Sequence, residues 1–194
     1  MRMANLERNT KETKITIQLN IDGSGKCRVS SRIGFLNHML ETFSKYGLFD
    51  IDAKIEGDIY VDQHHTIEDT GIVLGKVFNN ALGNKTKVKR VGFSICPMDE
   101  TLVMVVIDLS GRPYLKMDAK FKNKKVGDFQ TELLEDFFLG FVYSLKAALH
   151  IKIYYGRSDH HKIEAIFKAF GKALKEACEI ENRLEGVLST KEVL

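Results

Sequence analysis

The sequence predicts an α+β fold made of two similar fused halves, each an antiparallel-rich sheet with helices on one face. Three observations support this prediction. Segments with strand and helix patterns follow one another in the same order twice within the 194 residues. Short turns join many predicted strands directly, which favours hairpins over strict strand-helix-strand units. A cluster of polar side chains near the start of the second helix also recurs in each half.

In the first half, the alternation of polar and apolar side chains from Lys14 to Ile21 is typical of a half-buried strand. Asp22-Gly23-Ser24-Gly25 predicts a hairpin turn after it. Phe35 to Tyr46 shows instead the apolar spacing of a helix, which Gly47 can end. The remaining segments follow the same two patterns and predict strands at 26–29, 48–55 and 59–61 and a helix at 64–82.

The second half repeats this order. The expected strands are at 90–95, 102–109, 114–117 and 150–155, and the expected helices at about 129–149 and 159–180. We therefore expect half-repeats at 1–86 and 87–194 that form one compact unit. The tail at 181–194 has little periodicity, but Ser189-Thr190-Lys191 places two hydroxyls beside an ammonium, a composition suited to a phosphate.

The composition argues against a nucleic-acid or membrane surface. The chain has 29 basic and 26 acidic side chains, a balance too even for either. No run approaches the roughly 18 apolar residues of a membrane span, and the first residues lack the apolar core of a signal peptide. Cys27, Cys96 and Cys178 are far apart and form no C-x-x-C pair. We therefore expect a cytoplasmic protein with no membrane or nucleic-acid partner.

One metal-ligand pattern occurs twice, as His64-His65-x-x-Glu68 and His160-His161-x-x-Glu164. Both copies lie near the start of a predicted helix, where residues four apart share a face and the next residue points about 100° away. His64 and Glu68 can therefore bind one ion while His65 points toward another, and the second copy can do the same. A single copy could be accidental, but identical spacing in both halves predicts paired metal sites.

The repeat extends upstream and adds two candidate ligands. Alignment of the apolar stretches around them places His38 opposite Asp136. His38 precedes His64 by 26 residues (64 − 38) and Asp136 precedes His160 by 24 (160 − 136), a difference that one shorter hairpin turn would absorb. The set then holds five imidazoles and three carboxylates, enough for two ions with positions left for water or substrate. Nitrogen and oxygen donors without thiolate favour manganese, iron or zinc.

Distinctive motifs follow one another along the chain: Gly34 to Leu40 (GFLNHML), Asp62 to Asp69 (DQHHTIED), Pro97 to Glu100 (PMDE), Asp108 to Pro113 (DLSGRP) and Asp159 to Phe170 (DHHKIEAIFKAF). In these motifs the chain resembles the imidazoleglycerol-phosphate dehydratase family over essentially its whole length. The resemblance implies a ribosomal protein S5 domain 2-like fold and a small phosphorylated imidazole substrate. It also implies trimers assembled into a 24-subunit shell, with two manganese ions (Mn2+) per active site at subunit interfaces.

The resemblance further implies a role for each candidate residue. The metal ligands are His38, His64, His65, Glu68, Asp136, His160, His161 and Glu164. The substrate-binding residues are Glu12, His38, Arg90, Arg112, Lys168, Ser189 and Lys191. Glu12 and Glu164 are the catalytic carboxylates. Four positions depart from the family's usual residue: histidine is common at Asp136 and Tyr46, aspartate at Asn37 and glycine at Glu192.

The implied reaction is the loss of water from imidazoleglycerol phosphate to give imidazole acetol phosphate in L-histidine biosynthesis. A hydrogen and a hydroxyl must leave neighbouring carbons, and a ring held as an imidazolate by two metals can take up the released electrons. A carboxylate would transfer the proton. Two alternatives stay open here: a zinc hydrolase that uses the same ligands to activate water, and a metal-storage shell. The H-E-x-x-H pattern is absent, and storage would not require phosphate anchors.

Overall fold

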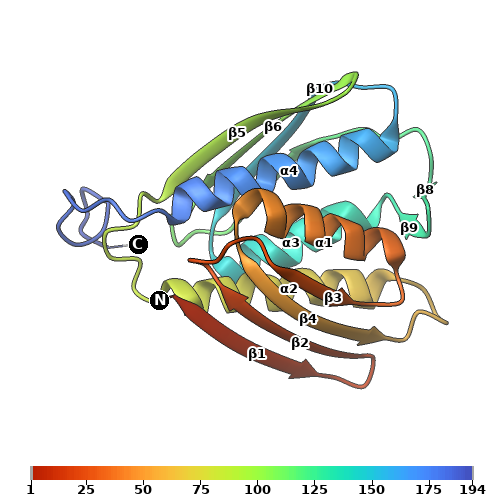
Figure 1. The fold of residues 1–194 in the computed structure, drawn as a ribbon, viewed down its shortest axis with the longest axis horizontal. Coiled ribbons are helices and arrows are strands. Elements are labelled where there is room, and N and C mark those ends of the chain that lie inside the picture. The colour runs from red at the N-terminus through yellow and green to blue at the C-terminus, as the bar shows by residue number, and fades with distance from the viewer. Residues whose placement is uncertain (1, 194) are drawn as a thin grey trace.

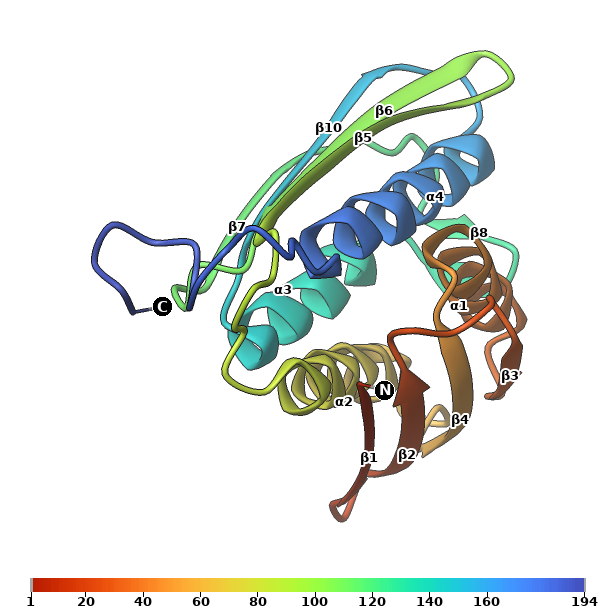
Figure 2. The same ribbon diagram turned by 60° about the vertical axis from the view of Figure 1, so that its left-hand side comes forward.

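Two four-stranded sheets enclose a layer of four helices in the computed structural model, which describes residues 2–193 (Figure 1, Figure 2). Each sheet covers two helices, and the helices of the two halves pack against each other in the middle (Figure 1). The predicted α+β class and the two similar halves are therefore confirmed.

The first half contains β1 (Met3–Asn9), β2 (Thr13–Asn20), β3 (Cys27–Ser30), α1 (Gly34–Gly47), β4 (Asp50–Gly57) and α2 (His64–Leu82). Its sheet has the strand order β1-β2-β4-β3. Neighbouring strands run antiparallel except β3 and β4, which are parallel. Helix α2 packs on β1 and β2, and α1 packs on β3.

The second half contains β5 (Val91–Met98), β6 (Thr101–Asp108), β7 (Tyr114–Asp118), β8 (Lys125–Val126), β9 (Phe129–Gln130), α3 (Leu133–Leu145), β10 (Ala148–Tyr155) and α4 (Asp159–Cys178). Its main sheet has the order β5-β6-β10-β7, in which β7 and β10 are parallel. This order reproduces that of the first sheet strand for strand. The small β8–β9 hairpin is an insertion before α3.

The core lies between the inner faces of the two sheets. Alternate side chains of the central strands point into it and are at most 2% exposed: Ile15, Ile17 and Leu19 on β2, and Val103, Val105 and Ile107 on β6. Phe43, Phe78, Phe141 and Phe170, one from each helix, form a closed ring of aromatic contacts at its centre, with centroid distances from 4.7 to 6.2 Å. Burial of one such side chain contributes about 1.5–3 kcal/mol. No helix within residues 2–193 has both the length and the apolar character to cross a membrane.

Glycines let the helices of opposite halves approach closely. Helix α1 packs on α4, and α2 packs on α3. A Cβ at Gly171 would lie 2.6 Å from the carbonyl oxygen of Phe43, and a Cβ at Gly75 would overlap the carbonyl oxygen of Phe141. These two glycines occupy equivalent positions of the repeat. The absence of a side chain at each crossing therefore sets the spacing between the halves.

Three predicted segments differ from the structure. Asp22-Gly23-Ser24-Gly25 is not a hairpin turn, because the strand after it, β3, pairs with β4 and not with β2. Residues 59–61 form a turn in which the Val61 N–H donates to the Asp58 carbonyl oxygen at 2.8 Å, not a strand. The helix expected at 129–149 spans only Leu133–Leu145, because β9 precedes it and Lys146 ends it in a left-handed conformation (φ 59°).

Two further differences concern the repeat. The sequence patterns do not predict β1, whose side chains alternate only between exposed and half-buried and so give a weak apolar signal. The spacing from His38 to His64 exceeds that from Asp136 to His160 because the loop before α2 (58–63) is longer than the loop before α4 (156–158). A hairpin turn does not cause the difference. The expected boundary between the half-repeats, at 86 and 87, falls in the loop between α2 and β5.

We expect Gly171→Ala to destabilise the protein, because the new methyl group would push α4 away from the α1 backbone. Overpacking of this kind costs about 1–3 kcal/mol, which the midpoint of urea unfolding would register. Gly34→Ala is the matched control, since its Cβ would meet Asp128 Oδ2 at an ordinary 3.4 Å. Equal unfolding midpoints for both variants and the parent protein would contradict the close-packing explanation.

Candidate functional site

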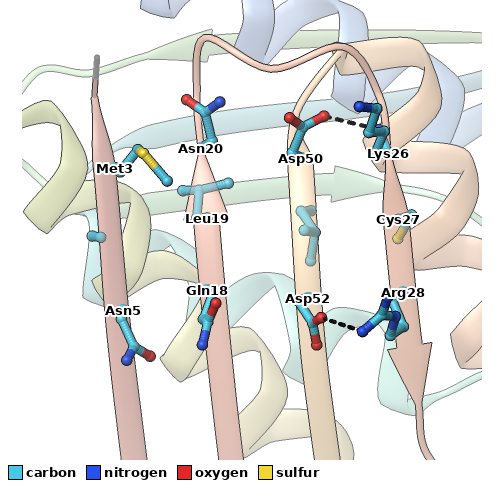
Figure 3. A pocket seen from close by; sticks show the side chains of 12 residues that line it. Met3, Asn5, Gln18, Leu19, Asn20, Lys26, Cys27, Arg28, Asp50 and Asp52 are labelled. Carbon is cyan, nitrogen blue, oxygen red and sulfur yellow. Dashed lines mark hydrogen bonds and ion pairs between the residues drawn. The ribbon is translucent and has the colours of Figure 1, made fainter.

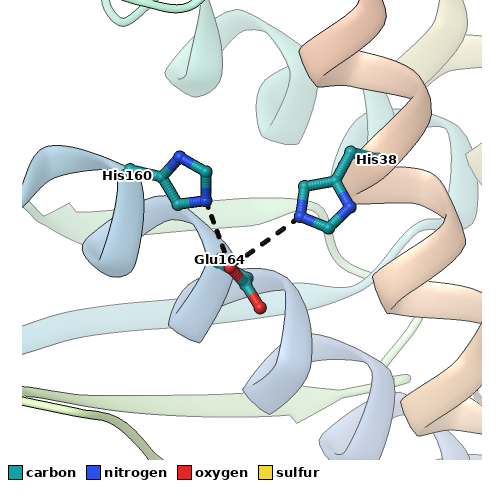
Figure 4. A group of neighbouring side chains, drawn as sticks. All are labelled: His38, His160 and Glu164. Carbon is teal, nitrogen blue, oxygen red and sulfur yellow. Dashed lines mark ion pairs between the residues drawn. The ribbon is translucent and has the colours of Figure 1, made fainter.

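Three predicted metal ligands converge where α1 crosses α4 (Figure 4). They are His38 on α1 and His160 and Glu164 on α4, and we call them the α4 cluster. Their candidate ligand atoms all lie within 4.8 Å of one another. Glu164 Oε2 is 3.3 Å from His160 Nε2 and 3.8 Å from His38 Nε2. Two imidazole nitrogens and one carboxylate oxygen in this arrangement can form one side of a metal coordination sphere.

Lys168 holds the carboxylate of Glu164 in place. Its Nζ lies 2.9 Å from Glu164 Oε1, so the other carboxylate oxygen faces the two histidines. Burial has the largest single effect and opposes charge on both side chains, but the ion pair between them, through its hydrogen bond and its charge attraction, outweighs burial. The ion pair holds the pKa of Glu164 below its ordinary value and that of Lys168 above its own. The ammonium also lies 5.4 Å from the ring centre of Tyr46, one of the departures from the family pattern.

The equivalent residues of the other half form a looser group, the α2 cluster, made of His64 and Glu68 on α2 and Asp136 on α3. His64 Nε2 lies 3.8 Å from Glu68 Oε2, and His64 Nδ1 lies 3.7 Å from Asp136 Oδ2. The two carboxylates thus approach opposite nitrogens of one ring. Asp136 therefore lies next to His64 of the other half, as its repeat equivalent His38 lies next to His160, but without the tighter convergence of the α4 cluster.

The second histidine of the first motif contacts other carboxylates. His65 Nδ1 lies 3.1 Å from Asp58 Oδ2 and 3.9 Å from Glu12 Oε2, instead of approaching Glu68 or Asp136. The hydrogen bond with Asp58 raises the pKa of His65. Glu12 lies in the turn between β1 and β2, so the hairpin and α2 together place this predicted catalytic carboxylate beside a predicted ligand.

His161, the second histidine of the other motif, makes the corresponding contact with Glu100. Its Nδ1 lies 2.7 Å from Glu100 Oε2, in the turn between β5 and β6. The backbone N–H of Ser158 and then His161 hold the pKa of Glu100 well below its usual range. The sequence places Glu100 in the PMDE motif but not among the candidate site residues, and it gives no signal for Asp58. Histidine-to-carboxylate contacts of this kind depend on loop geometry that periodicity does not encode.

Polar side chains accept hydrogen bonds from the first N–H groups of the helices that carry the candidate ligands. Asp62 Oδ1 accepts from the His64 N–H at 2.8 Å, and Ser158 Oγ accepts from the His161 N–H at 3.4 Å. The Ser158 cap of α4 contributes about 1 kcal/mol. Asp128, in the β8–β9 hairpin, accepts from the N–H groups of Gly34 and Phe35 at the start of α1, at 2.5 and 3.0 Å. The inserted hairpin thus fixes the helix that carries His38.

Four of the predicted substrate-binding residues line one cavity of about 610 Å³: Arg90, Arg112, Ser189 and Lys191. Asp108 holds the Arg90 guanidinium with a forked contact of 2.6 and 3.0 Å, and Arg90 Nη1 donates to the Leu188 carbonyl oxygen at 2.8 Å. Guanidinium and ammonium donors around an open cavity fit a phosphate dianion. The tail and the start of β5 thus form a candidate phosphate pocket.

The phosphate pocket and the α4 cluster lie near opposite ends of α4. The Arg90 N–H donates to the Ala177 carbonyl oxygen at 2.9 Å, near the end of this helix, while Glu164 is in its second turn. Ala177 follows Glu164 by 13 residues (177 − 164), a rise of about 20 Å along the helix. Figure 1 shows the tail and the β8–β9 hairpin at opposite ends of the fold. The structure therefore does not bring the phosphate anchors and the metal ligands of one chain around a common space, and Lys168 lies with the ligands.

Another cavity, of about 670 Å³, lies over the outer face of the first sheet (Figure 3). Its charged side chains pair with one another or with the backbone: Asp50 accepts from the Lys26 N–H at 2.9 Å, and Arg28 lies 3.4 Å from Asp52. Its lining includes none of the predicted site residues. We therefore do not assign it a catalytic role.

Comparisons with known proteins identify the family of the chain. The family model described as imidazoleglycerol-phosphate dehydratase matches residues 31–174. The imidazoleglycerol-phosphate dehydratases of Acetivibrio thermocellus and Koribacter versatilis are 52% and 54% identical to the chain, over 97% and 100% of both sequences, respectively. The crystal structure of IGPD from Pyrococcus furiosus in complex with (S)-C348 matches with a TM-score of 0.85 at 37% identity, over 97% of this chain and 100% of that one. By sequence and by fold, the chain belongs to the imidazoleglycerol-phosphate dehydratase family, whose members are lyases of histidine biosynthesis.

Proposed function

We propose that this enzyme dehydrates imidazoleglycerol phosphate to imidazole acetol phosphate and uses two manganese ions per active site. The convergence of His38, His160 and Glu164 within 4.8 Å is the observation that carries the proposal. A family relationship alone would leave the ligands unassigned. The convergence of these three side chains, which come from two helices of different halves, supports their assignment as ligands of one ion.

The donor set fits manganese. The eight candidate ligands, His38, His64, His65, Glu68, Asp136, His160, His161 and Glu164, offer imidazole nitrogens and carboxylate oxygens and no thiolate. Such mixed nitrogen and oxygen sets suit manganese, iron or zinc, and the extra carboxylate of Asp136 favours a harder ion among these. When bound, the two ions would supply Lewis-acid stabilisation of the substrate ring as an imidazolate.

The chain's own carboxylates would carry the protons. The Glu12 side chain is 54% exposed and its Oε2 lies 3.9 Å from His65 Nδ1, so it can exchange protons with water and reach a substrate bound at the metal that His65 would hold. Glu164 keeps one oxygen on Lys168 and turns the other toward His38 and His160. We assign proton transfer at the substrate to these two carboxylates and binding of the phosphate to Arg90, Arg112, Ser189 and Lys191.

A complete active site would require more than one copy of the chain. The phosphate pocket and the α4 cluster are separated by about 20 Å of helix, further than the three-carbon chain between the ring and the phosphate can reach. We therefore propose that one subunit supplies metal ligands and another supplies phosphate anchors. The assembly would be the 24-subunit shell built from trimers that the family resemblance implies.

The outer faces of the two sheets support this assembly. In the second sheet, Val91, Phe93 and Ile95 of β5 project outward and are 47%, 62% and 51% exposed. The equivalent positions of β1 are Met3, Asn5 and Glu7, mostly polar. Contiguous exposed apolar side chains mark interaction surfaces. We assign the β5–β6 face to contacts between copies and leave the first sheet's outer face to solvent.

A cytoplasmic location is part of the same proposal. Cys27, Cys96 and Cys178 are all free thiols. Burial raises the pKa of Cys178 to about 12 and that of Cys27 to about 11, so neither is a reactive thiolate at neutral pH. Unpaired, unreactive cysteines suit a reducing compartment.

Removal of metal should abolish dehydration of imidazoleglycerol phosphate, and added Mn2+ should restore it. The reason is that the ring imidazolate needs Lewis acids to form near neutral pH. Product formation by protein before chelation, after chelation and after Mn2+ addition provides the measurement, with metal content determined in each sample. Full turnover by protein verified to be metal-free would disprove the role of the metal. If the protein hydrolyses a substrate but does not dehydrate imidazoleglycerol phosphate, the alternative of a zinc hydrolase is favoured. If it binds metal and catalyses neither reaction, the alternative of a metal-storage shell is favoured.

Asp136→His should retain metal binding and some activity, whereas Asp136→Ala should lose metal at one position and most of its turnover. Both aspartate and histidine supply a lone pair, but alanine supplies none. Elemental analysis of metal per subunit, beside dehydration rates, provides the test. If Asp136→Ala keeps two ions per subunit and parental activity, Asp136 is not a ligand.

Mixed assemblies should recover activity that neither variant has alone. Arg112→Ala removes a charged donor worth about 1.5–3 kcal/mol to the phosphate, and His160→Gln removes a metal ligand. If the site is shared, co-expressed subunits combine an intact cluster from one variant with an intact pocket from the other. The matched control is Arg112→Ala with Lys191→Ala, in which both lesions affect the pocket and no recovery is expected. Purified mixed assemblies without recovered activity would show that the site is not shared in this way.

A further inference from the structure

Two carboxylates outside the predicted ligand set contact the same nitrogen of equivalent histidines. Asp58 Oδ1 and Oδ2 lie 3.2 and 3.1 Å from His65 Nδ1. Glu100 Oε2 lies 2.7 Å from His161 Nδ1. Among the described residues neither Nε2 has a hydrogen-bond partner, although Asp99 Oδ2 lies 3.8 Å from that of His161, so Nε2 is the nitrogen that can bind an ion. We propose that Asp58 and Glu100 are positioning residues that orient His65 and His161 as metal ligands.

The repeat does not account for these contacts. Asp58 directly follows β4, and the residue that directly follows β10 is Gly156. Glu100 lies in the β5–β6 turn, and the corresponding β1–β2 turn carries Glu12. Equivalent helices supply the histidines, but each half supplies the carboxylate from a different element. A carboxylate therefore contacts Nδ1 of the second histidine in both halves, although the two carboxylates occupy non-equivalent positions. This indicates that the histidines require such a contact and that the repeat alone did not produce it.

The two carboxylates are held in different ways. The Asp58 N–H donates to the Glu12 carbonyl oxygen at 3.0 Å, and the Asp58 side chain is only 12% exposed. Glu100 Oε1 accepts from the N–H groups of Arg157 and Ser158 at 3.1 and 2.8 Å, which leaves Oε2 for His161. Backbone donors therefore fix the Glu100 carboxylate directly, whereas Asp58 is held by its own main chain and by burial.

A fixed acceptor at Nδ1 has two effects on a histidine ligand. It sets the orientation of the ring, and it places the ring proton on Nδ1, so that Nε2 keeps the lone pair that a metal ion needs. In the first half, the contact of Asp58 with His65 also affects Glu12. Because Asp58 occupies His65 Nδ1 at 3.1 Å, Glu12 stays at 3.9 Å and remains available for proton transfer. The inference rests on the proposed function, since it assigns both histidines to metal ions.

Asp58→Asn and Glu100→Gln should each weaken Mn2+ binding by about 10–100-fold, the usual cost of losing such a supporting contact. The amide group can donate to Nδ1 and so favour the tautomer with the proton on Nε2. The measurement is titration of the metal-stripped full chain with Mn2+, followed by the paramagnetic resonance signal of the free ion. Asp52→Asn is the matched control, because this exposed carboxylate lies on the outer face of the first sheet beside Arg28.

A double-mutant cycle separates orientation of the histidine from a general structural role. In a His65→Ala background, Asp58→Asn should weaken Mn2+ binding no further, and the same holds for Glu100→Gln with His161→Ala. Additive losses, or parental affinity in both single variants, would overturn the inference and leave the proposed metal site standing. If the parent protein binds no Mn2+, the proposed function itself is wrong and the inference is wrong with it.

Discussion

The close approach of helices from opposite halves is the constraint on which the candidate site depends. His38 on α1 meets its partners on α4, and Asp136 on α3 meets its partner on α2, so neither half forms a cluster alone. Gly75 follows His64 by 11 residues, and Gly171 follows His160 by 11, so each motif carries its own crossing glycine. Ligand contacts of 3–4 Å leave little tolerance for a shift of the helices, and a tightly packed aromatic centre maintains their spacing.

The two strand turns beside the clusters show how equivalent halves acquire different tasks. Glu100 accepts two backbone N–H groups and contacts His161, so its pKa is held well below the usual range and it stays ionised. A carboxylate held in this way is a poor proton carrier. Glu12 has a longer contact with its histidine and greater exposure, because Asp58 makes the shorter contact in its place. One turn carboxylate is thus suited to support a ligand and the other to move a proton.

The parts of this structure that could be predicted from sequence are those encoded locally or by the repeat. Helix α2 begins at His64 and ends at Leu82 as expected, because apolar spacing and Gly83 mark it clearly. Asp136 could be found only by comparison of the halves. The pairing of β3 with β4 could not be predicted, since a turn sequence does not specify which distant strand will be adjacent. Asp58 was missed for a similar reason, because its contact with His65 arises from the loop that follows β4.

The inner and outer faces of the two sheets are under different constraints. Their inner faces cover the same helical core, so both are apolar and both have the same strand order. Their outer faces share no such partner and differ: Phe93 projects from β5 where Asn5 projects from β1. We propose that this difference lets the core stay symmetric while only the outer face of the second sheet contacts other copies of the chain. Such contacts would also complete the site, because the phosphate pocket and the α4 cluster of one chain are too far apart to serve one substrate.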